Sequence, residues 1–125
     1  MSGNGLVLVA DDDEDILMLV RLILERAGFE VMAARDGAEA VELACARPPQ
    51  LVVLDVTMPE VDGLEALERL RADERTAGVP VLLLSSRVQE ADVERGLAAG
   101  ATGYVPKPFS PRDLTARVAE LLTPG

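Results

Sequence analysis

The sequence predicts an α/β domain in which one parallel sheet lies between two layers of helices. Short, largely apolar runs recur along the chain, each of the length of a strand. Each run is followed by a stretch with apolar residues at helical spacing, which is typical of a helix with one buried face. Strands that alternate with helices pair in parallel, and continuous apolar runs indicate burial on both faces. The five expected strands are residues 6–10, 30–34, 51–54, 81–84 and 104–105.

The helices between these strands have recognisable ends. Gly28 and Gly100 follow apolar-periodic stretches, and glycine commonly ends a helix at such a position. Ser110 is a capping hydroxyl, followed by Pro111 at the first helical position and by Asp113 three residues after the cap. Together with a capping Asp36, these signals predict helices over residues 16–27, 36–47, 63–72 and 89–99 and from 111 onward.

The length of 125 residues predicts one domain with a single core, covering residues 1–125. The longest uncharged run is well short of a membrane span, and the first residues lack a basic segment followed by an apolar one. Cys45 is the only cysteine, which excludes an internal disulfide and a cysteine-rich metal cluster. We therefore expect a cytoplasmic protein without a membrane partner.

The charge and the missing histidine exclude several functions. Twelve basic and 22 acidic residues give a net charge of −10, which argues against direct binding of nucleic acid by this domain. The chain has no histidine, so Ser-His-Asp and Cys-His catalysis, His-ligated metals and a phosphohistidine are all excluded. Any metal must be held by oxygen ligands, which points to Mg²⁺, Mn²⁺ or Ca²⁺.

Polar side chains stand where four of the five expected strands end. Asp11 and Asp12 follow the first strand, Asp55 the third and Ser85 the fourth, and Lys107 comes just after the fifth. In a parallel sheet these ends meet at one edge, so the five side chains should converge. Three carboxylates repel one another unless cations compensate them. A divalent cation and the ammonium of Lys107 would supply that compensation.

This set of groups suits phosphoryl transfer. An Mg²⁺ held by two or three carboxylate oxygens keeps a coordination position for a phosphoryl oxygen. A carboxylate beside that cation can attack phosphorus and form an acyl phosphate. The cation, Lys107 and the Ser85 hydroxyl would then neutralise the equatorial oxygens of the phosphoryl group.

Four motifs, in order and over nearly the whole chain, resemble the receiver domain of the bacterial two-component response regulators. That family has a flavodoxin-like fold, a five-stranded parallel sheet in a three-layer sandwich. The resemblance implies a phosphorelay protein that needs Mg²⁺, with Mn²⁺ as an alternative. The matching motifs are the acidic pair Asp11-Asp12, Leu54 to Pro59 with Asp62-Gly63, the strand-ending Ser85, and Tyr104 to Phe109 with Lys107-Pro108.

The resemblance also implies a function for each matching residue. Asp55 would be the phosphoacceptor, and Lys107 would pair with the phosphoryl group across a cis Lys107–Pro108 bond. Ser85 and Tyr104 would form a switch pair, in which Ser85 moves to the phosphoryl group and Tyr104 packs inward. The expected metal ligands are Asp11, Asp12, Asp55 and the backbone carbonyl of Thr57.

In such a phosphorelay, Asp55 accepts a phosphoryl group from a sensor histidine kinase or a histidine phosphotransfer protein. The chain would be a switch that catalyses only its own phosphorylation and dephosphorylation. Phosphorylation would shift the domain between two conformations and change its affinity for an output protein or domain, or for a second copy in a homodimer. The expected output face combines the fourth helix, fifth strand and fifth helix, around Val88, Glu90, Arg95, Leu97, Tyr104 and Lys107.

Met18 and Leu22 in the first helix have two interpretations. They lie one turn apart and outside the expected buried stripe, so both should be exposed. Scattered apolar side chains are normal on a protein surface. They could also form a docking patch beside Asp55 for a kinase or phosphotransfer helix. The stripe expected to be buried is Ile16, Val20, Ile23, Leu24 and Ala27.

Two other functions compete with the phosphorelay receiver. A small phosphatase of the haloacid-dehalogenase type also uses an Asp nucleophile and Mg²⁺, but needs a second carboxylate two residues later, where this chain has Thr57. A degenerate receiver that binds a partner constitutively is disfavoured because every site residue is present. The residues leave open the cognate kinase, the output, and whether the receiver stands alone or belongs to a longer regulator.

Overall fold

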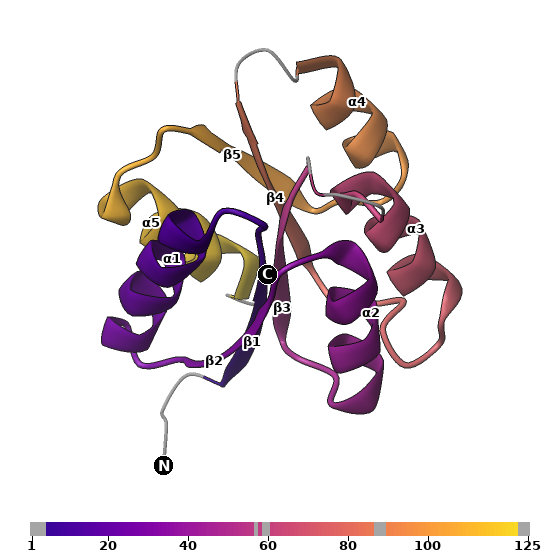
Figure 1. Cartoon of the computed structure of the whole chain (residues 1–125), viewed down its shortest axis with the longest axis horizontal. Coiled ribbons are helices and arrows are strands. Elements are labelled where there is room, and N and C mark those ends of the chain that lie inside the picture. Colours follow the sequence, from indigo (N-terminus) through magenta and orange to yellow (C-terminus); the bar gives the residue numbers. More distant parts are fainter. Residues whose placement is uncertain (1–4, 57, 59–60, 87–89, 123–125) are drawn as a thin grey trace.

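Strands and helices alternate strictly along the chain in the computed structural model, which describes residues 5–56, 58, 61–86 and 90–122 (Figure 1). This confirms the alternation predicted from the sequence. Within these ranges, none of the helices is both long and apolar enough to cross a membrane. The elements are β1 (Leu6–Ala10), α1 (Glu14–Arg26), β2 (Glu30–Ala34), α2 (Gly37–Ala46), β3 (Leu51–Asp55), α3 (Gly63–Ala72), β4 (Val81–Ser86), α4 (Glu90–Ala98), β5 (Gly103–Lys107) and α5 (Pro111–Leu122).

The five strands form one sheet in the order β2-β1-β3-β4-β5, and every neighbouring pair is parallel. Helices α1 and α5 cover one face, and α2, α3 and α4 cover the other (Figure 1). Alternate residues of each strand point to opposite faces, so β1 sends Val7 and Val9 toward α1 and Leu8 toward α2 and α3. All three are fully buried, as expected for a central parallel strand. The predicted flavodoxin-like three-layer sandwich is therefore confirmed.

The buried stripe of α1 includes Leu17, which was not predicted, and buries the predicted Ile16 and Ala27 only in part. Asp13 caps the helix by accepting hydrogen bonds from the backbone N–H groups of Asp15 at 2.9 Å and Ile16 at 3.3 Å. The face turned to the sheet runs through Leu17, Val20 and Leu24, with Ile23 beside it. Ile16 lies at the margin of that face and is only half-buried, as is Ala27 at the helix end. The predicted stripe omitted Leu17 and was wrong at this position. Leu17 lies one turn before Val20, in the middle of the face that packs against the sheet.

Acidic N-caps begin the three helices that follow β1, β2 and β3. Asp13, Asp36 and Asp62 each accept a hydrogen bond from a backbone N–H in the first turn. These N–H groups have no acceptor within the helix itself. Ser110 does the same for α5, accepting from the Asp113 N–H at 3.0 Å, as the sequence predicted. Because each helix follows a parallel strand, the three acidic caps lie at the same edge of the sheet as the strand ends.

At the opposite edge, the Arg71 side chain joins two loops. Its guanidinium donates to the backbone carbonyl of Gly100, after α4, at 2.8 and 3.1 Å. It also donates to the carbonyls of Val79 at 2.8 Å and Ala77 at 3.1 Å, before β4. Burial lowers the pKa of the guanidinium from its usual value, and the hydrogen bonds to these carbonyls compensate its charge.

Arg71→Ala should lower the free energy of unfolding by about 1–3 kcal/mol, because it removes several hydrogen bonds from a charged donor. Thermal unfolding followed by circular dichroism should show a melting temperature lower by several degrees. Arg69→Ala is the matched control, since the Arg69 guanidinium pairs with Glu65 on the exposed side of the same helix. Equal melting temperatures for the two variants would contradict this function of Arg71.

Candidate functional site

Two neighbouring strands bring Asp11 and Asp55 together. Ala10 pairs with Leu54 in the register of β1 and β3, so the residues that follow them lie side by side. Asp11 is fully buried and Asp55 is only 4% exposed, whereas Asp12 is open to solvent. Carboxylate oxygens of all three lie within 4.8 Å of one another. The acidic cluster predicted from the strand ends is therefore present in the structure.

Backbone hydrogen bonds hold both acidic loops. The N–H of Asp11 donates to the Ala34 carbonyl at 3.1 Å, and the Asp11 carboxylate accepts from the Asp13 N–H at 2.9 Å. On the other loop, the Val56 N–H donates to the Leu84 carbonyl at 3.0 Å. These bonds hold the main chain at Asp11 and next to Asp55, and so they restrict the positions of the two carboxylates.

Lys107, the last residue of β5, bridges the two buried carboxylates. Its Nζ lies 3.1 Å from Asp11 Oδ2 and 3.2 Å from Asp55 Oδ1. Burial by itself would lower the pKa of the ammonium, but the charges of Asp55 and Asp11 outweigh it and hold this pKa above its usual value. One ammonium against three carboxylates leaves a formal excess of two negative charges. That excess and the all-oxygen donor set fit a hard divalent cation.

Ser85 and Tyr104 occupy different environments. Ser85 lies in β4, next to the strand that carries Asp55, and is 2% exposed. Tyr104 lies in the edge strand β5 opposite Leu83, and 40% of it is exposed. The structure thus brings Ser85 to the strand ends and leaves Tyr104 at the surface. The inward position expected of Tyr104 after phosphorylation stays a prediction.

The remaining predicted residues lie away from the cluster or outside the described residues. Met18 and Leu22 are 72% and 45% exposed on α1, which confirms their expected exposure. Thr57 and Val88 are outside the described residues, as is the side chain of Glu90. The Lys107–Pro108 peptide bond is cis, as the resemblance implied.

One contact of the loop that follows Asp55 was not foreseen from the sequence. The N–H of Gly37, at the start of α2, donates to the Val61 carbonyl at 3.1 Å. The available signal was Asp36-Gly37, in which a glycine stands directly after a capping aspartate although alanine is the better helix former. A glycine there indicates close approach of another backbone.

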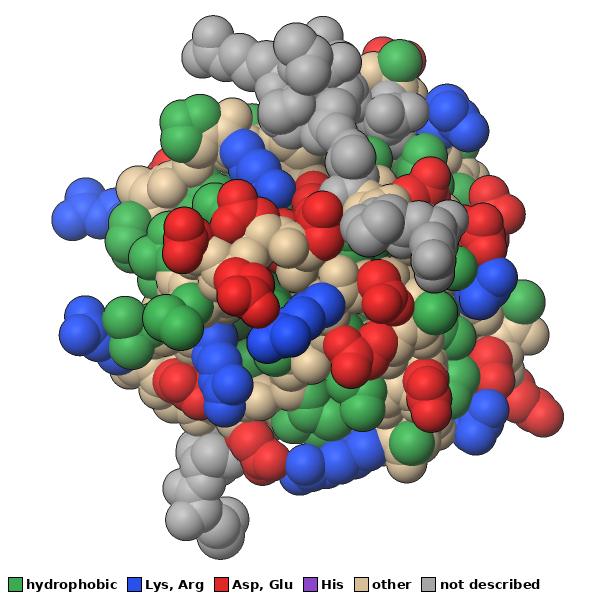
Figure 2. All heavy atoms as spheres, in the orientation of Figure 1, with side chains coloured by type: hydrophobic (Ala, Val, Ile, Leu, Met, Phe, Trp, Pro, Cys, Tyr) green, Lys and Arg blue, Asp and Glu red, His purple; other side chains and the backbone are tan. Residues whose placement is uncertain are grey.

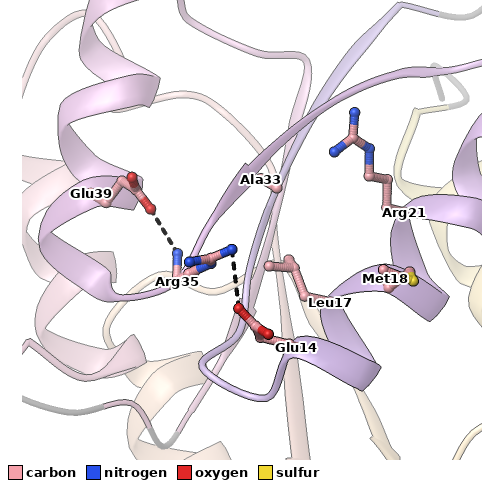
Figure 3. A pocket seen from close by; sticks show the side chains of 7 residues that line it. All are labelled: Glu14, Leu17, Met18, Arg21, Ala33, Arg35 and Glu39. Carbon is pink, nitrogen blue, oxygen red and sulfur yellow. Dashed lines mark hydrogen bonds and ion pairs between the residues drawn. The ribbon is translucent and has the colours of Figure 1, made fainter.

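A hollow of about 420 Å³ lies between α1 and the turn from β2 to α2 (Figure 3). Arg35 crosses it, pairing with Glu14 at 3.0 Å, while the Arg35 N–H donates to Glu39 at 2.8 Å. Leu17 and Met18 also line the hollow. Its lining includes none of the three clustered carboxylates, so this hollow is separate from the acidic site.

The comparisons with known proteins agree with this geometry. The family model described as the response regulator receiver domain matches residues 7–119. The chain belongs to the response regulator receiver family. Receiver domains are signalling modules of two-component phosphorelays rather than metabolic enzymes.

Individual relatives support the assignment. The alkaline phosphatase synthesis transcriptional regulatory protein PhoP of Bacillus subtilis is 43% identical over 119 residues, covering 95% of this chain and 49% of that protein. The chemotaxis response regulator CheY4 of Vibrio cholerae is 32% identical with a TM-score of 0.90, covering 96% of this chain and all of that one. This chain spans about half the length of curated relatives that it matches.

A third relative bears on the metal. The receiver domain of sensor histidine kinase PA1611 from Pseudomonas aeruginosa is 26% identical, with a TM-score of 0.89 over 96% of this chain and 98% of that one. Its structure has a magnesium ion coordinated in the active site cleft. The acidic cluster of this chain offers the oxygen ligands that such an ion prefers.

Asp12→Ala should weaken Mg²⁺ binding at least about tenfold, because it removes one carboxylate from the cluster. Lys107→Ala should not weaken it, because that change removes a cation that competes for the same oxygens. Isothermal titration calorimetry with MgCl₂ measures both affinities, and Asp15→Asn, in the exposed first turn of α1, is the control. Wild-type affinity in Asp12→Ala would place the cation elsewhere.

Proposed function

We propose that this receiver domain accepts a phosphoryl group on Asp55 from a phosphohistidine of a sensor kinase or a phosphotransfer protein. The observation that carries the proposal is the position of the Lys107 ammonium, 3.2 Å from Asp55 Oδ1 and 3.1 Å from Asp11 Oδ2, beside a third carboxylate. A carboxylate nucleophile, a fixed cation and a second cation site are the groups that phosphoryl transfer to an aspartate needs.

Asp11, Asp12 and Asp55 would hold Mg²⁺, or Mn²⁺ in its place, together with the proposed Thr57 carbonyl, which lies outside the described residues. The ion would supply positive charge to the oxygens of the transferring group. The chain has no histidine, so the phosphohistidine must belong to the partner. Once the donor and the cation are bound, residues of this chain would supply the nucleophile and the second cationic group.

An oxygen of the Asp55 carboxylate forms a bond to phosphorus as the phosphorus–nitrogen bond of the donor breaks, and the freed imidazole takes up a proton. Lys107 is within reach of the product, since its Nζ already contacts Asp55. It can pair with a phosphoryl oxygen without leaving the site. Attack of water on the acyl phosphate would later regenerate the carboxylate, so the domain catalyses only its own phosphorylation and dephosphorylation.

The switch would start at Ser85, which is buried on the strand next to Asp55. A hydrogen bond from its hydroxyl to the phosphoryl group would pull β4 toward Asp55, and Tyr104 on the neighbouring strand could then pack inward. The output face formed by α4, β5 and α5 includes the exposed Leu97 and Tyr104. A change there would alter the affinity for an output protein or domain, or for a second copy of the chain.

The donor would dock beside Asp55 on α1. Figure 2 shows hydrophobic side chains gathered over α1, at the left of the view. The exposed apolar residues of this helix are Met18, Leu19 and Leu22, at 72%, 41% and 45% exposure. An amphipathic helix of the donor could cover such a patch.

We also propose that residues 1–125 form a single receiver domain in a cytoplasmic phosphorelay. The curated relatives PhoP of Bacillus subtilis and GltR of Pseudomonas aeruginosa are about twice as long and are transcriptional regulatory proteins. This supports an output that reaches transcription through a DNA-binding domain or partner protein rather than through direct contact of this acidic domain with DNA.

Asp55→Asn should abolish phosphoryl uptake. Intact mass after incubation with acetyl phosphate and Mg²⁺ should show one added phosphoryl group on the wild type and none on the variant. Asp62→Asn is the control, because asparagine can also cap α3 and Asp62 stands only seven residues from Asp55. Labelling of Asp55→Asn at the wild-type level would show that another residue accepts the phosphoryl group.

Met18→Asp/Leu22→Asp should slow transfer from the phosphorylated donor protein at least about tenfold, because charge replaces the apolar docking surface. Uptake from acetyl phosphate should stay near the wild-type rate, since that donor needs no docking. Leu97→Asp on α4, where Leu97 is 42% exposed, is the matched control. Unchanged transfer from the donor protein would refute docking on α1.

A further inference from the structure

The turn between β2 and α2, residues 34–37, forms a backbone hydrogen bond to each half of the acidic site. At its start, the Ala34 carbonyl accepts from the Asp11 N–H at 3.1 Å. At its end, the Gly37 N–H donates to the Val61 carbonyl at 3.1 Å. One bond thus reaches the loop of Asp11 and Asp12, and the other reaches the loop that follows Asp55.

The second contact needs a glycine. A Cβ atom at position 37 would lie 2.2 Å from the Val61 carbonyl oxygen and 2.7 Å from Val61 Cγ1. The nearer atom belongs to the main chain, so it cannot rotate aside as the end of a flexible side chain can. A methyl group at Gly37 must therefore displace either the start of α2 or the loop around Val61.

A displacement at Val61 would reach Asp55 through Gly63, which lies against the backbone of Asp55 and Val56. The Gly63 N–H donates to the Val56 carbonyl at 2.9 Å, so Gly63 lies against the residue that follows Asp55. A Cβ at Gly63 would lie 2.2 Å from the Asp55 carbonyl oxygen, which shows how closely the two backbones approach. Val61 is two residues before Gly63 and cannot shift without moving this contact.

The turn itself is held in place by polar contacts (Figure 3). Asp36 Oδ1 accepts from the Glu39 N–H at 2.8 Å, and Glu39 Oε1 accepts from the Arg35 N–H at 2.8 Å. The Arg35 guanidinium pairs with Glu14 at 3.0 Å, two residues after Asp12. The turn is thereby tied both to α2 and to the first turn of α1.

We propose that this turn sets the separation between the metal carboxylates and the Asp55 loop, with Gly37 as the positioning residue. No side chain of residues 34–37 belongs to the acidic cluster, so the turn acts through Asp11 and Val61. The proposal rests on the proposed function, because the separation matters only where the carboxylates bind one cation together. On this proposal, residues 34–37 contribute to Mg²⁺ affinity and phosphoryl uptake although they lie outside the acidic cluster.

The test compares Gly37→Ala with Gly78→Ala. A Cβ at Gly78 meets no atom within 4 Å, so it controls for the glycine substitution itself. Thr76→Ala, which removes a buried hydrogen bond to the Leu70 carbonyl at the far edge, controls for lost stability. Calorimetric titration with MgCl₂ should show affinity about tenfold weaker in Gly37→Ala only. In metal-free protein, the amide resonances of Asp11, Val56 and Gly63 should also shift only in that variant.

Each outcome decides the proposal. A folded Gly37→Ala with wild-type Mg²⁺ affinity and unshifted resonances overturns it, and so does an equal loss in Thr76→Ala. If Gly37→Ala does not fold, Glu39→Ala loosens the turn without a clash and should weaken the affinity about threefold, whereas wild-type affinity again overturns the proposal. A wild type that binds no Mg²⁺ would instead contradict the proposed function, so the two failures are distinguishable.

Discussion

The contact of one ammonium with two buried carboxylates is the interaction on which the rest of the site depends. Charged groups lose hydration when they are buried, and they remain ionised in a protein interior only when partners compensate them. Asp11 and Asp55 have this compensation from Lys107, which is separated from Asp11 by 96 positions in sequence. The site therefore forms only when the whole sheet is assembled, from β1 to the edge strand β5.

The same dependence explains why so much of the site was predictable. In a parallel sheet the strand ends meet at one edge, so locating the apolar runs sufficed to bring Asp11, Asp55 and Lys107 together. The helix caps at Asp36 and Ser110 were predictable because they depend on residues within one turn. Both kinds of inference use the periodicity of the chain and local chemistry, without the details of packing.

Other features could not be derived this way. Leu17 is buried and Ile16 only half-buried because the rotation of α1 about its axis is set by packing against the sheet, which the hydrophobic pattern fixes only to within about one residue. The close approach of Gly37 to Val61 joins two loops that are distant in sequence. A glycine in a sequence can indicate a close backbone approach, but it does not show which residue approaches. Tyr104 is 40% exposed because it lies in the edge strand β5, and its single position in a short apolar run does not show which way the side chain points.

The acidic helix caps have a consequence for the charge of a molecule that approaches the acidic cluster. Asp13, Asp36 and Asp62 all lie at the edge of the sheet that holds the acidic cluster. The helix N-termini offset about half a charge each, so the field above this edge stays negative. Within the screening length of about 8 Å at physiological salt, this field slows the approach of an anion and favours the approach of a basic side chain. A free anion or an acidic surface therefore approaches this edge more slowly than a basic surface does.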